Sequence, residues 1–394
     1  MENNLINEQQ LINWRRHLHE YPEVGLQEYK TTNFIIEILE SFNCLEILRP
    51  CHTGVVACLK GKFDGPSIAL RADIDALSMQ EIQNDGIPCS KISGVAHTCG
   101  HDTHTAMLLE ACRILCGYQS LLHGSIYFIF QANEETPPGG AKSIVDSGIL
   151  NHVEAFYGMH ISPGLETGHL YVVEKGAAST ASDTFSIKVK GKGTHGSMPH
   201  MGVDPIVVSS SIILALQTII SRNIDPNQTA VISLGQIHGG SASNIIPDSV
   251  ELEGTIRTLD ENTRIQIKKR LSEIVKGICD SYGANYELHI EEGYPSVTND
   301  EKLTAHTLEV LSKTFQPAHL HYFTQINASE DFAYYQQIAP STYFILGAGL
   351  KKDGYIYANH NPHFMIDEDA LKYGVKYYVS VALEALGVDL NEKN

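Results

Sequence analysis

Short apolar runs alternate with helical stretches through the first 160 residues, and this alternation limits the possible folds more than any other feature of the chain. The runs at 67–70, 126–130 and 155–159 are typical of buried strands, whereas 103–116 has the apolar period of a helix. Strands that alternate with helices form βαβ units and therefore a largely parallel sheet. We predict an α/β fold with a mostly parallel central sheet.

Polar side chains follow each of these three predicted strands. Asp73 and Asp75 come after the first strand, Glu134 and Glu135 after the second, and His160 after the third. Ligands of parallel sheets bind just beyond the carboxyl ends of the strands. The sequence therefore predicts that these side chains share one site.

The middle of the chain has a different pattern. Its elements follow the order β-α-β-β-α-β, with strands near 184–190, 230–234, 250–257 and 286–291 and helices at 205–221 and 260–282. This order is typical of the split βαβ, ferredoxin-like arrangement. The α/β pattern then returns. We predict that residues 1–181 and 295–394 form one domain, into which residues 182–294 are inserted as a ferredoxin-like α+β domain.

The charge balance excludes one class of partner. The 394 residues include 28 Lys+Arg and 46 Asp+Glu, which gives a formal net charge of −18. An acidic chain repels phosphate backbones, so we expect no nucleic-acid partner. The polar stretch 1–16 lacks the apolar core of a signal peptide, and no apolar run approaches the ~20 residues of a membrane span. We therefore expect a cytoplasmic protein that does not bind membranes.

Residues 97–104, HTCGHDTH, form the most informative motif. They place three imidazoles, one thiol and one carboxylate directly before an apolar helix. Thiolate, imidazole and carboxylate are the ligands of zinc and similar ions. The alternative is a polar helix-capping loop with Asp102 or Thr103 as the cap. A third interpretation is a thiol redox sensor centred on Cys99, which would hold no metal.

Two adjacent carboxylates, Glu134 and Glu135, end a buried apolar run. Because neighbouring side chains at the end of a strand point in different directions, one can bind a metal while the other acts as a general base. Paired acids are more often a solvated surface, but the buried run before them favours a site. His160 and His363 are isolated histidines that gain weight only as members of a set.

Taken together, these motifs resemble the aminoacylase/carboxypeptidase family of co-catalytic metallohydrolases. Within that family they resemble the amidohydrolase branch, which includes hippurate hydrolase, auxin-conjugate hydrolases and N-acetyldiaminopimelate deacetylase. The motifs run nearly end to end and are WRRHLH at 14–19, LRADIDAL at 70–77, CGHD at 99–102, EE at 134–135, GMH at 158–160, GTHGSMPH at 193–200, NIIP at 244–247, GTIR at 254–257, SEDF at 329–332 and HNPHF at 360–364.

The resemblance implies a site for two divalent metal ions, and Zn, Mn, Co and Ni all suit its ligands. Cys99 looks like the ligand shared by both ions. The resemblance gives the remaining ligands as His101, Glu135, His160 and His363. It gives Glu134 as the general base and Asp73 as a supporting carboxylate.

The inserted domain resembles the lid and dimerisation domain of the family. His195 looks like the residue that enters a partner subunit's active site to hold the scissile carbonyl oxygen. Asn244 and Arg257 resemble residues that contact the substrate. The resemblance therefore implies a homodimer or a higher homo-oligomer.

These observations predict a hydrolase that cleaves the amide bond of N-acyl amino acids with a metal-activated water. The alternative within enzymes is a metallo-exopeptidase that acts on dipeptides or short peptides. A protein that has kept the fold but lost catalysis is disfavoured, because Glu134 and all of the proposed ligands are present. The chain departs from the branch at Asn133, Pro137 and Pro138, which leaves the substrate preference open.

Overall fold

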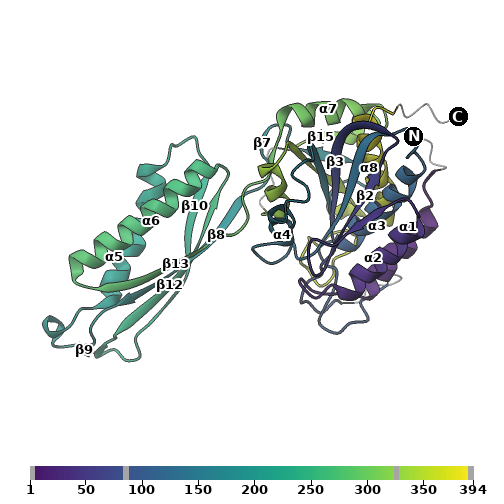
Figure 1. The fold of residues 1–394 in the computed structure, drawn as a ribbon. Coiled ribbons are helices and arrows are strands. Elements are labelled where there is room, and N and C mark those ends of the chain that lie inside the picture. The colour runs from purple at the N-terminus through teal and green to yellow at the C-terminus, as the bar shows by residue number, and fades with distance from the viewer. Residues whose placement is uncertain (1–4, 83–87, 324–327, 389–394) are drawn as a thin grey trace. The chain divides into compact units, whose positions relative to one another are not determined.

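The computed structural model describes residues 5–82, 88–323 and 328–388 (Figure 1). Contacts within the chain divide it into two compact units. The larger unit comprises residues 1–178, 298–325 and 331–394, and the smaller unit comprises residues 179–297 and 326–330.

A central sheet organises the larger unit, and the described residues form eight of its strands in the order β1-β2-β4-β3-β5-β16-β6-β15. The four strands β4, β3, β5 and β16 at its centre run parallel. The pairs β1–β2, β2–β4 and β16–β6 are antiparallel. The bounds are β1 Glu46–Leu48, β2 Val55–Lys60, β3 Phe63–Asp73, β4 His123–Gln131, β5 Ala155–Ser162, β6 Leu170–Val172, β15 Leu320–Tyr322 and β16 Ser341–Gly347. This mostly parallel centre confirms the predicted fold class.

Helices of the larger unit pack against this sheet. Their bounds are α1 Glu8–Glu20, α2 Tyr29–Ser41, α3 His101–Cys116, α4 Gly140–Asp146, α7 Glu301–Ser312 and α8 Leu371–Ala385. Helix α3 is buried on nearly all sides, which is typical of a helix in the middle of a core. Its first turn carries the end of the motif at 97–104, so the core of the unit holds this motif in place.

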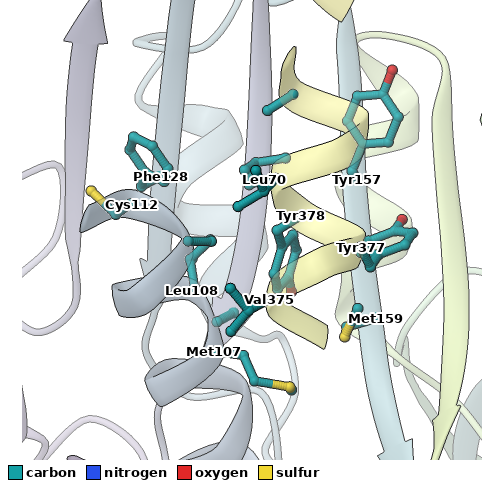
Figure 2. Packing of buried hydrophobic residues seen from close by; sticks show 14 of the residues in the cluster. Leu70, Met107, Leu108, Cys112, Phe128, Tyr157, Met159, Val375, Tyr377 and Tyr378 are labelled. Carbon is teal, nitrogen blue, oxygen red and sulfur yellow. The ribbon is translucent and has the colours of Figure 1, made fainter. Parts of the chain in front are cut away.

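Figure 2 shows how α3 and α8 lie side by side over the strands of the sheet. Leu108 on α3, Val375 on α8 and Leu70 on β3 are fully buried in the same cluster. Gly374 allows this close approach, because a Cβ atom at that position would lie 2.0 Å from the Met107 sulfur. The packing therefore fixes β3 and α3 against each other, and both lead into the polar residues of the predicted site.

The smaller unit contains an antiparallel sheet with the order β10-β12-β8-β13. The elements are β8 Ala181–Lys190, α5 Pro205–Thr218, β10 Ala230–Gly239, β12 Ser249–Thr258, α6 Glu261–Tyr282 and β13 Asn285–Glu291. Alternate residues of β8, namely Phe185, Ile187 and Val189, pack into a core with both helices. A short ribbon of β9 Thr194–His195 and β11 Ile245–Ile246 extends from this sheet. The chain order and the strand order are ferredoxin-like, as predicted.

Helix α5 continues into a short π-helix at Ile219–Asn223, so the helical segment spans Pro205–Asn223. By length and composition this segment is long and apolar enough to cross a membrane, although a core helix of a soluble protein passes the same test. Val208, Ile212 and Leu216 form its buried face against the sheet.

Candidate metal centre

Four of the predicted metal ligands lie together beyond the carboxyl ends of β3, β4 and β5. Cys99 precedes α3, His101 begins it, Glu135 follows β4 and His160 lies on β5. Cys99 Sγ lies 3.3 Å from His160 Nε2, and His101 Nε2 lies 3.8 Å from Glu135 Oε1. The three parallel strands are neighbours, so they bring together segments that are distant in the sequence.

Hydrogen bonds orient both histidines of this cluster. His101 Nδ1 lies 2.9 Å from the Asp75 carbonyl oxygen, and His160 Nδ1 lies 2.7 Å from the Ile161 carbonyl oxygen. A carbonyl only accepts, so each Nδ1 carries the proton and donates it. In the neutral form of both rings, Nε2 then has the lone pair that binds a metal.

The chemistry of these side chains fits a divalent cation. His101 Nε2 is buried and makes no hydrogen bond to another described residue, and the buried Glu135 Oε1 is contacted by the rings of His101 and His360. Burial, and then the charge of Glu135, raise the pKa of the Cys99 thiol. A bound cation reverses this effect, because coordination stabilises the thiolate. Thiol, imidazole and carboxylate side chains gathered at one point therefore match the ligand set of zinc and similar ions.

The structure brings His360, and not the predicted His363, to this cluster. His360 Nε2 lies 3.2 Å from Glu135 Oε1, and its ligand atom forms a compact group with those of Cys99 and Glu135. His363 instead stacks on Tyr357, with 4.8 Å between the ring centroids. Hydrogen bonds that His360 donates to Cys99 and Glu135 raise the pKa of His360 to about 10, which reflects the negative potential at this point.

The backbone explains this correction. His360 has a φ of 64°, which is rare for a residue other than glycine, and its N–H donates to the Thr98 carbonyl at 2.8 Å. These two features turn the His360 side chain toward the cluster. The motif HNPHF contains two histidines on either side of a proline, and nothing in its spacing shows which one turns inward.

Asp73 is fully buried and supports the cluster through its contacts with neighbouring side chains. Arg71 donates to Asp73 Oδ2 at 2.7 Å, and His104 Nδ1 lies 2.6 Å from Asp73 Oδ1. His104 Nε2 in turn accepts the N–H of Ile161 at 2.8 Å. Both nitrogens of His104 are therefore engaged, so the close group of Asp73, His101 and His104 is a supporting network and not a second set of ligands.

Glu134, the predicted general base, lies beside the ligands. Its carboxylate, that of Glu135 and the His101 ring offer ligand atoms within 4.8 Å of one another. The N–H of Glu135 donates to Asp75 Oδ2 at 3.0 Å. Asp75 therefore contacts both the ring of His101 and the peptide between the two glutamates, which makes it a positioning residue that the sequence only placed nearby.

The other three predicted residues lie in the smaller unit, at two ends of its sheet. His195 on β9 and Asn244 next to β11 are exposed neighbours, and the N–H of Gly196 donates to the Asn244 carbonyl at 2.8 Å. Arg257 lies on β12 opposite Ser182. Eight residues of β12 separate Arg257 from Ser249, where the strand begins near β11, which corresponds to roughly 25 Å of strand.

Comparison with known proteins identifies the family. The model of peptidase family M20/M25/M40 matches residues 69–384, well over half of the chain. The chain belongs to this family. An N-acyl-L-amino acid amidohydrolase of Geobacillus stearothermophilus is 43% identical over 289 residues, which cover 73% of this chain and 78% of the relative. Thermostable carboxypeptidase 1 of Saccharolobus solfataricus is 40% identical over 377 residues, which cover 95% of each chain.

A solved structure of the M20 family agrees with the fold. The Bacillus subtilis YXEP protein, a dinuclear metal binding peptidase, aligns with a TM-score of 0.83 and 34% identity. The alignment covers 98% of this chain and 100% of that protein. The resemblance drawn from the sequence motifs and the predicted fold class are both confirmed.

Proposed function

We propose that this M20 protein is a metal-dependent hydrolase that cleaves the amide bond of N-acyl amino acids. The observation that carries this proposal is the convergence of the ligand atoms of Cys99, His101 and Glu135 beside a second carboxylate, Glu134. The name of the Geobacillus relative supports the same substrate class. In this proposal residues 182–294 form a lid and dimerisation domain, which is inserted in the catalytic domain.

Two divalent ions suit this site. Cys99 would be the shared ligand, and the other ligands would be His101, Glu135, His160 and His360. When bound, such ions polarise the scissile carbonyl and lower the pKa of a bound water towards about 7.

The residues of the chain then manage the protons. Glu134 accepts a proton from the attacking water and delivers it to the leaving amine nitrogen, which prevents the amine from leaving as an anion. Asp75 keeps the proton of His101 on Nδ1 and orients the peptide of Glu135. Asp73 and Arg71 form a buried ion pair, with 2.7 Å between Arg71 Nη1 and Asp73 Oδ2. This pair keeps the part of the site next to the cluster charged and rigid.

His195 carries its proton on the nitrogen that this reaction requires. The N–H of Ser197 donates to His195 Nδ1 at 3.2 Å, so this nitrogen is an acceptor. The proton of the neutral ring is therefore on Nε2. An Nε2–H on an exposed side chain can donate to the carbonyl oxygen as negative charge develops on it.

We propose that His195 serves the site of a second copy of this chain. Within the smaller unit, His195 lies beyond one end of β8, a strand of ten residues, and Arg257 lies at its other end, roughly 30 Å away. Arg257 would clamp a substrate carboxylate, and Asn244 would contact the substrate beside His195.

Exposed apolar side chains support a homodimer formed through the smaller unit. Ile206, Val207 and Leu214 on α5 are 42%, 49% and 73% exposed. Apolar residues on the outer face of a helix indicate a surface that another protein covers. We propose that a second copy of this chain covers this face and that the enzyme acts in the cytoplasm.

One experiment tests the hydrolase and a second tests the shared site. A panel of N-acetyl and N-benzoyl amino acids, assayed with Zn, Mn, Co and Ni, should reveal turnover that a chelator abolishes.

Equal mixing of Glu134→Gln and His195→Ala chains should then restore about a quarter of wild-type activity, because half of the dimers are mixed and each has one complete site. A mixture as inactive as its parents contradicts the shared site.

A metallo-exopeptidase that acts on dipeptides is the second candidate. The observation that favours it is the 40% identity to a relative named as a carboxypeptidase. Free dipeptides and their N-acylated counterparts, matched in the C-terminal residue, separate the two functions. Turnover of only the free dipeptides would replace our first proposal with the second.

A further inference from the structure

Two buried carboxylates hold the backbone on either side of the proposed base Glu134. The N–H of Asn133 donates to Glu28 Oε1 at 2.8 Å, and the N–H of Glu135 donates to Asp75 Oδ2 at 3.0 Å. Glu28 and Asp75 come from separate segments, one before α2 and one after β3. The N–H groups of the residues before and after Glu134 are therefore both attached to the protein core.

The backbone of Asn133 is in the left-handed region, with a φ of 54°. Most side chains avoid this region, although asparagine tolerates it better than most. Gly25 packs so closely that a Cβ atom there would lie 2.2 Å from Asn133 Oδ1. The Asn133 side chain donates to the Thr136 carbonyl at 3.0 Å, and its own carbonyl accepts from Gly140 at 2.9 Å.

Glu28 does not cap helix α2, although it is the residue directly before the helix. Its side chain makes no capping hydrogen bond to the helix. Glu23 caps the helix instead, by accepting the N–H of Thr31 at 2.8 Å. The Glu28 carboxylate is fully buried, and burial raises its pKa. A buried carboxylate is costly unless it accepts hydrogen bonds, and this one also bonds the Thr53 hydroxyl and its own backbone N–H.

We propose that Glu28 is a positioning residue, which aims Glu134 and Glu135 by holding the left-handed peptide of Asn133. This proposal deepens the proposed function, because it rests on Glu134 as the base and Glu135 as a metal ligand. A displacement of about 1 Å in a catalytic group can lower a rate by roughly 100-fold. The loss of the Glu28 oxygen frees the Asn133 peptide to rotate, and this rotation carries the next two side chains with it.

Four variants test the proposal at saturating metal. Glu28→Ala removes the acceptor and should lower kcat about 10- to 100-fold while KM changes less than about threefold. Glu28→Gln retains an oxygen that can accept the same bond, so it should restore most of kcat. Asn133→Gly adopts a positive φ without strain, so Glu28→Ala should cost clearly less in that background.

Glu110→Ala is the matched control. Glu110 is also fully buried and also accepts a backbone N–H, that of Asn7 at 2.6 Å, but it lies on α3 away from the site. It should leave the kcat of the folded enzyme unchanged. If Glu28→Ala and Glu110→Ala lower kcat equally, or if Asn133→Gly does not reduce the effect of Glu28→Ala, the proposal is overturned.

Hydrogen exchange supplies a measurement that does not depend on activity. In the metal-free protein, Glu28→Ala should accelerate amide exchange in the peptide that spans residues 131–136, whereas Glu110→Ala should not. Unchanged exchange in that peptide contradicts the role of Glu28. Absence of wild-type turnover on every N-acyl amino acid would instead refute the proposed function, and the exchange result would still stand by itself.

Discussion

The candidate residues of the two units differ in how firmly the fold holds them in place. In the larger unit, His101 and Glu135 are held by hydrogen bonds from other segments before any ligand arrives. In the smaller unit, His195 and Asn244 are exposed and their contacts are local to their own ribbon. A preorganised centre is typical of groups that act on charge and protons. Exposed residues on a ribbon are typical of groups that contact a substrate or a second copy of the chain.

The largest expected effect concerns the larger unit. Glu134→Gln keeps the shape of the side chain but removes the base, so kcat should fall by about 10²- to 10⁴-fold. Metal content, measured by mass spectrometry, should stay at the wild-type level, because Glu134 is not among the proposed ligands. Retained activity would remove Glu134 as the base.

A comparison of two histidines tests the corrected ligand set. His360→Ala should weaken metal binding by at least about 100-fold, since the loss of a group that merely orients a ligand already costs 10- to 100-fold. His363→Ala should retain both metal ions, because its ring stacks on Tyr357. Titration of the metal-free proteins with Zn²⁺ measures both. The reverse order of affinities would restore the prediction made from the sequence.

A buried ion pair shows that the smaller unit also has a rigid part. Arg264 Nε donates to Asp183 Oδ2 at 2.8 Å, and the same guanidinium donates to the Gly293 carbonyl at 3.0 Å. Asp183→Ala leaves a buried positive charge without its partner, so it should destabilise this unit by about 3–5 kcal/mol. Denaturant unfolding measures the change. A loss below about 1 kcal/mol would show that the pair behaves like a surface pair.

The exposed ribbon should respond in the opposite way. His195→Ala removes a donor to the developing oxyanion, so kcat should fall about 10²- to 10³-fold, with unchanged metal content and unchanged thermal stability. His200→Ala, on the same exposed segment, is the control and should remain active. Equal activity of the two variants would show that the ribbon takes no part in catalysis.

The smallest expected effect is on the outer face of α5. Leu214→Ser changes a side chain that is 73% exposed, so the stability of the isolated chain should change by no more than about 0.5 kcal/mol. The same change should weaken a dimer, which sedimentation over a range of concentrations measures. An unchanged association would place the dimer surface elsewhere.

The sequence was most informative where a local pattern carries the physics. The parallel strands followed from apolar runs between helices, because burial on both faces requires such runs. The ligand types followed from the motif at 97–104, because few other sites place thiol and imidazole so close together. The apolar run of β4 indicated in the same way that Glu134 and Glu135, which follow it, belong to a site. These features depend on neighbours in the chain, so the chain alone reveals them.

Other features depend on contacts between distant segments. The sequence did not distinguish His360 from His363, because the choice rests on a left-handed backbone and on the carbonyl of Thr98. It gave no sign that Glu28 reaches Asn133, since 105 residues separate them. It also concealed the exposed face of α5, because composition does not show which side of a helix the sheet covers.

By itself, the amino-acid sequence determined the fold class, the family and the types of group that meet at the site. The tertiary structure decided which histidine turns inward, which nitrogen of each ring carries the proton and which carboxylates hold the proposed base. The reason is physical. Periodicity and ligand chemistry are written in residues close along the chain, whereas tautomers, backbone strain and the direction of a side chain are set by groups that only folding brings within hydrogen-bond distance.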